Sequence, residues 1–100
     1  MAIYDIQFSA QFLQTGGGSH NMEIWLEKNG TTVPDSGGVT TFVGNSAKVI
    51  VGWNYVEPLA AGDHVKLAWW SNFAGIDIVA LASEGPGAAV PSVIVTVVQV

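Results

Sequence analysis

Apolar and polar residues alternate with a period of two in the first segment of the chain. Its apolar face consists of Tyr4, Ile6, Phe8, Ala10 and Phe12. Its opposite face consists of Asp5, Gln7, Ser9 and Gln11. Such alternation is typical of a β-strand with one buried side. No stretch of ten residues keeps the i, i+3, i+4, i+7 pattern of an amphipathic helix, so the pattern predicts an all-β protein.

The rest of the chain also divides into expected strands separated by turn residues. After the first segment, strands are predicted over residues 22–27, 31–33, 39–43, 47–56, 64–71, 76–82 and 91–100. Loops are expected over residues 16–21, 34–38 and 83–89. Asn29-Gly30 is a residue pair that favours a two-residue type I′ hairpin turn. Short strands spaced in this way predict a single domain over residues 1–100, an antiparallel β-sandwich of the jelly-roll or Greek-key kind.

The last segment of the chain departs from this alternation. Its β-branched residues occupy both faces of the expected strand, with Val93, Val95 and Val97 on one face and Ile94 and Val98 on the other. A strand that is apolar on both sides needs a cover on each side. A domain of 100 residues has little interior to supply the second cover. We therefore expect another copy of the chain to supply it.

The composition points in the same direction. Hydrophobic residues make up 49% of the chain and charged residues 11%, which is less than half the usual charged share of about 25%. No apolar run approaches the roughly 20 residues of a membrane-spanning helix, so membrane insertion is not expected. The first five residues lack the basic start and apolar core of a secretory signal, so the chain is expected to stay in the cytoplasm where it is made, or to be released by lysis.

Charge and missing residue types exclude further classes of function. The net charge is −5 and the chain has no arginine, which argues against nucleic acid as a partner. The chain has no cysteine either, which excludes disulfides, thiolate metal sites and a thiol nucleophile. Stability is therefore expected to come from packing alone.

Few residues suggest catalysis or metal binding. Ser19-His20 offers a hydroxyl beside a base, but neighbours on a strand point to opposite faces and no acid is placed to orient the imidazole. His20 and His64, with Asp63 or Glu23, have no recognised metal-ligand spacing, although a trimer could gather three copies of one histidine on its axis. Solvated turn histidines are the favoured interpretation.

Three aspartates lie in or near turns, where their carboxylates could supply oxygen ligands for calcium. Asp35, Asp63 and Asp77 lack the Asp-x-Asp-x-Asp-Gly spacing, so a calcium site would have to be assembled from separate loops. Asp63 is expected instead to accept hydrogen bonds from its own turn. We predict a non-enzymatic protein with no cofactor and no metal.

The tryptophans divide according to strand register. Trp53 and Trp69 fall on inward registers and are expected in the core, whereas Trp25 and Trp70 oppose the inward sets. Either outward tryptophan could be a sugar-stacking platform or a subunit contact. The contact is favoured in so apolar a chain, because aromatic residues are enriched in interface cores.

Several segments resemble the small jelly-roll head of the complement and tumour-necrosis-factor superfamily. Lys28-Asn29-Gly30 matches a hairpin of that family, and residues 59–65 match its turn into the next strand, with the family's spacing. Trp53-Asn54-Tyr55-Val56 before this turn, and residues 89–97 at the end, are similar to a variant found in structural and fibre-tip domains of tailed bacteriophages. The resemblance covers residues 4–100.

The resemblance implies a homotrimer that serves as a structural or host-recognition module of a virion, in capsid decoration, a neck or a fibre head, with no chemistry of its own. Other virion proteins, or a glycan or receptor on the host surface, are the implied partners. Candidates for the subunit interface are Tyr4, Phe8, Phe12, Trp25, Trp70, Val93, Val95 and Val97. Candidates for partner-binding loops are Gly17, Ser19, His20, Asp35, Ser36 and Glu84. The alternative is a small carbohydrate-binding lectin that uses Trp25 or Trp70.

Overall fold

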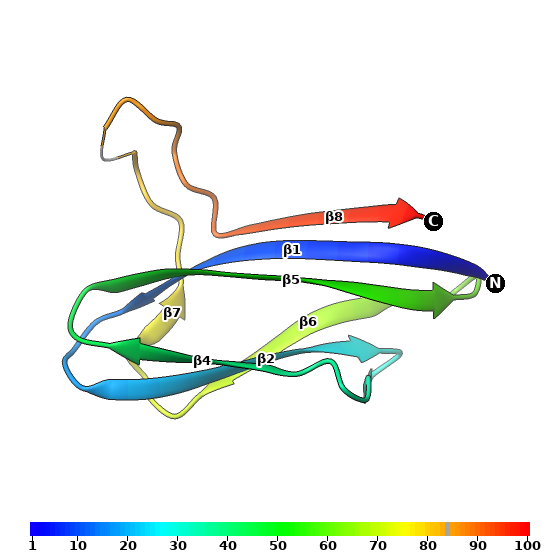
Figure 1. Cartoon of the computed structure of the whole chain (residues 1–100), viewed down its shortest axis with the longest axis horizontal. Coiled ribbons are helices and arrows are strands. Elements are labelled where there is room, and N and C mark those ends of the chain that lie inside the picture. Colours follow the sequence, from blue (N-terminus) through cyan, green and yellow to red (C-terminus); the bar gives the residue numbers. More distant parts are fainter. Residues whose placement is uncertain (84) are drawn as a thin grey trace.

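The computed structural model describes residues 1–83 and 85–100, and these residues form β-strands joined by turns (Figure 1). The strands are β1 (Ala2–Gln14), β2 (Ser19–Lys28), β3 (Thr31–Thr32), β4 (Gly38–Val43), β5 (Ala47–Leu59), β6 (Val65–Ser71), β7 (Ile76–Ile78) and β8 (Val93–Gln99). They make two antiparallel sheets that pack as a sandwich, which confirms the predicted fold class. The connectivity is compatible with a jelly roll. No helix in the described part of the chain is long and apolar enough to cross a membrane.

The first sheet is built around β1. One edge of β1 pairs with β5 along its whole length, from Ala2 opposite Leu59 to Gln14 opposite Ala47. The other edge pairs with β8 and then with β7, which lie end to end along it. The order places β5 at one end of this sheet, and β8 and β7 at the other.

The segment between β7 and β8 leaves the sheet and returns to it at one residue of β1. The Val79 N–H donates to the Gln11 carbonyl over 2.9 Å, and the Gln11 N–H donates to the Ser92 carbonyl over 2.9 Å. Between these points an isolated bridge joins Leu81 and Val90. In Figure 1 the described residues of this segment, on either side of residue 84, project away from the sandwich. The strand predicted over residues 76–82 is therefore shorter than expected, because β1 pairs with only its first three residues.

The second sheet is built around β2. One edge of β2 pairs with β4 over residues 19–24 and with β3 at residues 27 and 28, and the other edge pairs with β6. Ser19 and His20 were expected in a loop, but they are the first residues of β2 because Val43 and Phe42 pair with them. The predicted hairpin turn is confirmed, since Asn29 and Gly30 both have positive φ, 52° and 82°.

The core lies between the two sheets and is formed by the inward residues of the alternating strands. Its buried members are Ile6, Phe8, Ala10, Phe12, Met22, Ile24, Leu26, Phe42, Tyr55 and Ile76. Phe12 is completely buried and links the two sheets, because its ring meets those of Phe42 and Trp69 edge-on at centroid distances of 6.0 and 5.2 Å. Edge-to-face pairs of this kind are a favoured aromatic geometry.

One corner of the sandwich joins the turn at Lys28-Asn29-Gly30 to the turn at residues 59–65. The Asn29 side chain donates to Asp63 Oδ1 over 2.9 Å, and its Oδ1 accepts from the His64 N–H over 3.0 Å. Lys28 Nζ donates to the Pro58 carbonyl over 2.8 Å and lies 3.7 Å from Glu57 Oε1. The Lys28-Asn29-Gly30 turn and the turn at residues 59–65 thus form one hydrogen-bonded unit. Their residues have a structural role in the fold.

Candidate functional site

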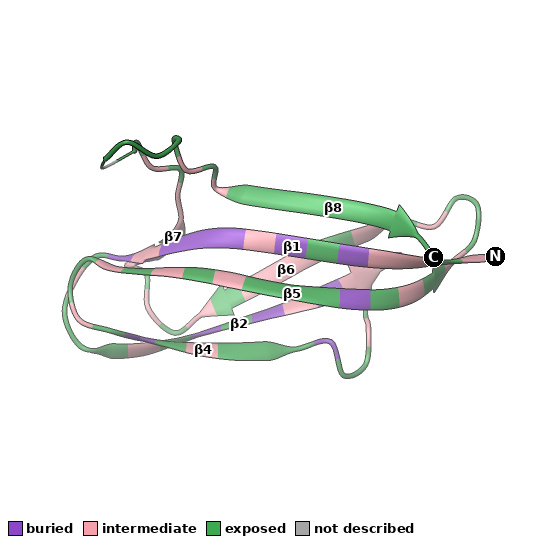
Figure 2. Cartoon of the chain, turned by 45° about the horizontal axis from the view of Figure 1, so that its top comes forward, coloured by how far each residue is buried: buried purple, intermediate pink, exposed green. Residues whose placement is uncertain are grey.

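Strand β8 is exposed along its whole length (Figure 2). All seven of its residues are exposed. The register puts Val93, Val95 and Val97 opposite Ala10, Phe8 and Ile6, on the core-facing side of the first sheet. Val95 and Val97 nevertheless remain 53% and 52% exposed.

The opposite face of β8 is uncovered as well. Ile94 and Val98 are 53% and 54% exposed, so the apolar character that the sequence gives to both faces meets solvent on both faces. Neither sheet supplies a cover, because β1 occupies one edge of the strand and the second sheet does not extend beneath it far enough to bury its valines. A continuous apolar surface of this kind is typical of an interaction site.

The overall dimensions show that the chain is more open than a compact monomer of its size. The accessible surface is 6011 Å², whereas a folded monomer of 10.5 kDa exposes about 5,400 Å². The radius of gyration is 15.2 Å, against about 13 Å for a compact domain of 100 residues.

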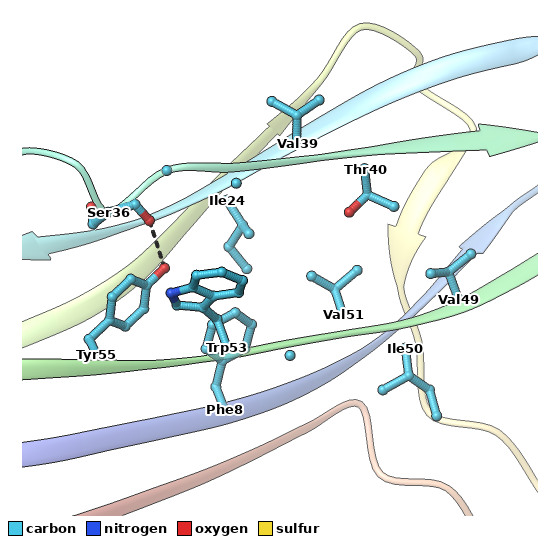
Figure 3. A pocket seen from close by; sticks show the side chains of 13 residues that line it. Phe8, Ile24, Ser36, Val39, Thr40, Val49, Ile50, Val51, Trp53 and Tyr55 are labelled. Atoms are coloured by element: carbon cyan, nitrogen blue, oxygen red, sulfur yellow. Dashed lines mark hydrogen bonds between the residues drawn. The ribbon is translucent and has the colours of Figure 1, made fainter.

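A second apolar surface lies at the other end of the first sheet. The free edge of β5 and the start of β4 enclose a groove of about 340 Å³. Figure 3 shows Val49, Val51 and Trp53 on the β5 side, with Thr40 and Ile24 across from them. None of the lining residues is charged. The groove is therefore a place where apolar side chains can be desolvated without leaving an ion unpaired.

Trp53 corrects an expectation from the sequence. It shares the inward face with its partner Phe8, as predicted, but its side chain is 68% exposed. The reason is that β5 ends the sheet, so the inward direction at this edge opens into the groove (Figure 3). Trp69, in contrast, packs on the ring of Phe12 and is partly buried, as expected.

One end of the groove is held by a buried polar contact. The Tyr55 hydroxyl donates to the Ser36 carbonyl over 2.8 Å (Figure 3), and burial raises the pKa of Tyr55, which keeps it protonated as a donor. The Ser36 hydroxyl accepts from the Leu26 N–H over 3.1 Å and donates to the Val33 carbonyl over 2.8 Å. This fixes the segment before β4 against β2 and β5, so the groove is preformed at this end.

The remaining tryptophans lie on the outer face of the second sheet. Glu23 is opposite Trp70 and Trp25 is opposite Ala68, so the two indoles are diagonal neighbours on β2 and β6. Trp70 is 52% exposed, in agreement with its predicted outward register. The Trp25 Nε1–H donates to Glu27 Oε2 over 3.1 Å. The two outward tryptophans are thus brought together next to carboxylates.

Two of the three interface candidates on β1 are buried inside the protomer and are not available to a second subunit. Phe8 and Phe12 are 5% and 0% exposed and form part of the core of one protomer, so we remove them from the set of interface candidates. Tyr4 packs against the same core and is only half-buried. The row of aromatic residues is therefore a core row, because the second sheet covers this part of β1.

The candidate loop residues do not form one surface. Gly17 is exposed, and its carbonyl lies 3.2 Å from His20 Nε2, while the His20 ring stacks on Phe73 at a centroid distance of 3.7 Å. Asp35 is exposed with a positive φ of 60°. Ser36 is buried at 5% exposure, so it is not displayed to a partner.

Two further candidate positions complete this set. Ser19 is exposed at the start of β2. The candidate at Glu84 falls outside the described residues.

The histidine and carboxylate side chains that could serve in catalysis or metal binding do not form a metal-ligating cluster among the described residues. Within residues 1–83 and 85–100, no group of three or more histidine or carboxylate side chains is arranged to hold a metal ion. Asp63 accepts from the Ala60 N–H over 2.8 Å, as its predicted turn role requires. This backbone hydrogen bond, followed by the bond from Asn29 and the charge of Lys28, lowers the pKa of Asp63. The carboxylate is therefore used within the corner.

Sequence reasoning missed one buried polar anchor. Gln14 is completely buried, and its Nε2 lies 3.0 to 3.1 Å from the carbonyls of Gly16, Gly18 and Gly44. Within the described residues its Oε1 has no hydrogen-bond partner. The only signal in the sequence is a polar residue at an inward position of the first strand, just before a glycine run. Its role is to hold the loop ends together.

Comparison of the chain with family models, with curated proteins and with solved structures gave no match. The functional argument therefore depends on the surfaces of the molecule itself.

Proposed function

We propose that the protein is a non-enzymatic structural module that functions as a homotrimer in a phage-like virion, as a capsid decoration, neck or fibre-head component. The observation that carries this proposal is β8, an uncharged strand whose apolar side chains are exposed on both faces. The surface excess over a compact monomer supports it as well. The mechanism of action is association, which turns small protomers into one rigid assembly that displays loops.

The energy available from this surface is sufficient for association. Fully burying a Val or Ile side chain contributes about 1.5–3 kcal/mol, so completing the burial of a half-exposed one contributes about 1 kcal/mol. The five apolar residues Val93, Ile94, Val95, Val97 and Val98 together provide about 5 kcal/mol per protomer before entropy costs. The groove beside β5 adds a second apolar surface. Together these surfaces support an oligomer held by apolar contacts.

The virion setting is supported by the family resemblance of the motifs at residues 28–30 and 59–65, which meet in one corner of the fold. It has its own test. A virion component is recovered with purified particles on a density gradient, at a constant ratio to the major capsid protein. Recovery only in the soluble fraction of a lysate contradicts the virion assignment while leaving the oligomer intact.

The oligomer is tested by a charge placed on β8. Val95 is 53% exposed in the protomer, so V95D is expected to fold, but association would bury an unpaired carboxylate. Sedimentation velocity and native mass spectrometry are expected to show a trimer for the unmodified chain and a folded monomer for V95D. The matched control is V43D, at a 72% exposed position on β4 that does not line the groove, which is expected to remain trimeric. A trimeric V95D with unchanged stability contradicts the proposal.

A second candidate function, a carbohydrate-binding lectin, is favoured by one observation. Trp25 and Trp70 lie as diagonal neighbours on an outer sheet face, next to Glu23 and Glu27. Flat indoles beside carboxylates are suited to stacking on a sugar ring and accepting bonds from its hydroxyls. Glycan-array binding that W70A abolishes and W53A preserves, in a protein that stays monomeric, identifies the lectin. Absence of glycan binding in the trimer rejects it.

A further inference from the structure

The first sheet of the protomer has two open ends, and both are apolar. At one end, β8 exposes uncharged aliphatic side chains on both faces. At the other end, β5 has its second edge free of any strand among the described residues, with the uncharged groove beside it. Strand β8 contains no charged residue, and none of the residues that line the groove is charged. Each surface therefore lacks a partner, and neither carries a charge that would oppose their meeting.

The two surfaces also match in length and in side-chain spacing. Strand β8 comprises seven residues, Val93–Gln99, and the β5 side of the groove runs over the equal stretch 49–55. On β8 the inward side chains are Val93, Val95 and Val97, at every second position. A strand added to a free sheet edge directs every second side chain into the space below that edge. Three small branched side chains would thus enter a groove of about 340 Å³.

A closed ring requires a contact between two different surfaces of the same chain, whereas a twofold dimer uses one surface twice. Pairing β8 with β8 of a second copy would leave the groove and Trp53, 68% exposed, open in both copies. Pairing β8 with the groove of a second copy covers the groove and the inward face of β8 at once. The second arrangement is the one that removes the larger apolar area from water.

We infer that β8 of one copy binds along the free edge of β5 in the next copy, with Val93, Val95 and Val97 in the groove beside Trp53. This inference rests on the proposed self-association and assigns its two surfaces. β5 and β8 are both antiparallel to β1, so they are parallel to each other within a protomer. Rotation about an axis along the strands preserves that direction, so the junction between copies is a parallel pair. The first sheets of the copies then form one continuous sheet.

The inference is tested by disulfide crosslinking between engineered cysteines. The native chain has no cysteine, so every disulfide that forms joins two engineered residues. V95C is mixed under oxidising conditions with V49C, V51C or W53C, in which the groove side of β5 carries the second thiol. The control partner is V43C, on the outer face of the second sheet. A mass tag on one component distinguishes mixed from symmetric products. Disulfides form only when the Cα atoms approach within about 7 Å.

Mixed disulfides between V95C and at least one of the groove variants, at least tenfold above the V43C control, are the expected result. Symmetric V95C–V95C products in place of mixed ones overturn the inference, because they identify a twofold β8 contact. An oligomer in which no groove variant is crosslinked overturns it too, while leaving the proposed function intact. A native chain that is monomeric at every concentration overturns both.

Tryptophan fluorescence gives a readout that needs no cysteine. Filling of the groove removes Trp53 from water, so the emission is expected to shift to shorter wavelength as the concentration rises through association. In W53F this concentration-dependent shift is expected to be lost while the oligomer persists. An equal shift in W53F and in the native chain contradicts burial of Trp53 in the contact.

Discussion

Replacing Val95 and Val97 by threonine separates folding of the protomer from association. The substitution keeps the branched shape and exchanges a methyl group for a hydroxyl. The two valines are 53% and 52% exposed, so folding of the protomer buries about half of each side chain. Burial of a methyl-sized group contributes about 0.8 kcal/mol, which makes the expected loss of unfolding free energy about 0.4 kcal/mol per site, or about 1 kcal/mol for V95T/V97T.

The effect on association is larger. Association buries the other half of each side chain, so the loss of the two methyl groups removes about another 1 kcal/mol of association free energy in total. Each hydroxyl is also taken out of water, at a cost of about 1–3 kcal/mol where no hydrogen-bond partner is present. The double variant is therefore expected to lose about 3 kcal/mol or more of association free energy, which weakens association at least about 100-fold.

Two assays measure the two effects separately. Sedimentation equilibrium gives the association constant. Urea unfolding at protein concentrations at which the oligomer is dissociated gives the free energy of unfolding of the protomer. V43T is the matched control, because Val43 is 72% exposed and lies outside the groove, and neither quantity is expected to change. The reasoning is refuted if V95T/V97T lowers protomer stability by about 3 kcal/mol and leaves association unchanged, because β8 would then belong to the protomer core.

Three further predictions concern the protomer alone. A Cβ at Gly75 would collide with the Thr15 carbonyl oxygen, so G75A is expected to lower the unfolding free energy in urea by about 1–3 kcal/mol, whereas G17A, in open space, should not lower it. Hydrogen bonds lower the pKa of Asp63 in the folded protein. The carboxylate of Asp63 therefore stabilises the folded protein fully above the ordinary carboxyl pKa of about 4, and this contribution is lost as the pH falls through the lowered pKa of the folded state. The stability difference between the native chain and D63N should therefore narrow in acid; a constant difference would contradict this. A variant that lacks residues 80–91 is expected to unfold cooperatively on heating, because the chain leaves and rejoins β1 at the same residue, Gln11. Loss of the cooperative unfolding transition would show that the excised segment stabilises the sandwich.

The strands and the inward faces of the sheets follow from the sequence, because a period of two is a local property of the backbone. The row Tyr4 to Phe12 predicted the first strand and its core face, and Asn29-Gly30 predicted a turn that needs two positive φ angles. The amino-acid sequence alone also showed that residues 93–98 are apolar on both faces of the strand. These inferences needed no knowledge of which strands are neighbours.

Strand order, which depends on contacts between distant residues, was decided only by the tertiary structure. Trp53 and Phe8 have the same inward register, yet Phe8 is buried and Trp53 is exposed, because β1 lies inside the sheet and β5 ends it. In the same way, alternation placed Val95 on the core side, but only the packing of the second sheet determined that half of it stays in water. A sequence specifies which way a side chain points through local geometry, whereas what it meets there depends on the neighbouring strands.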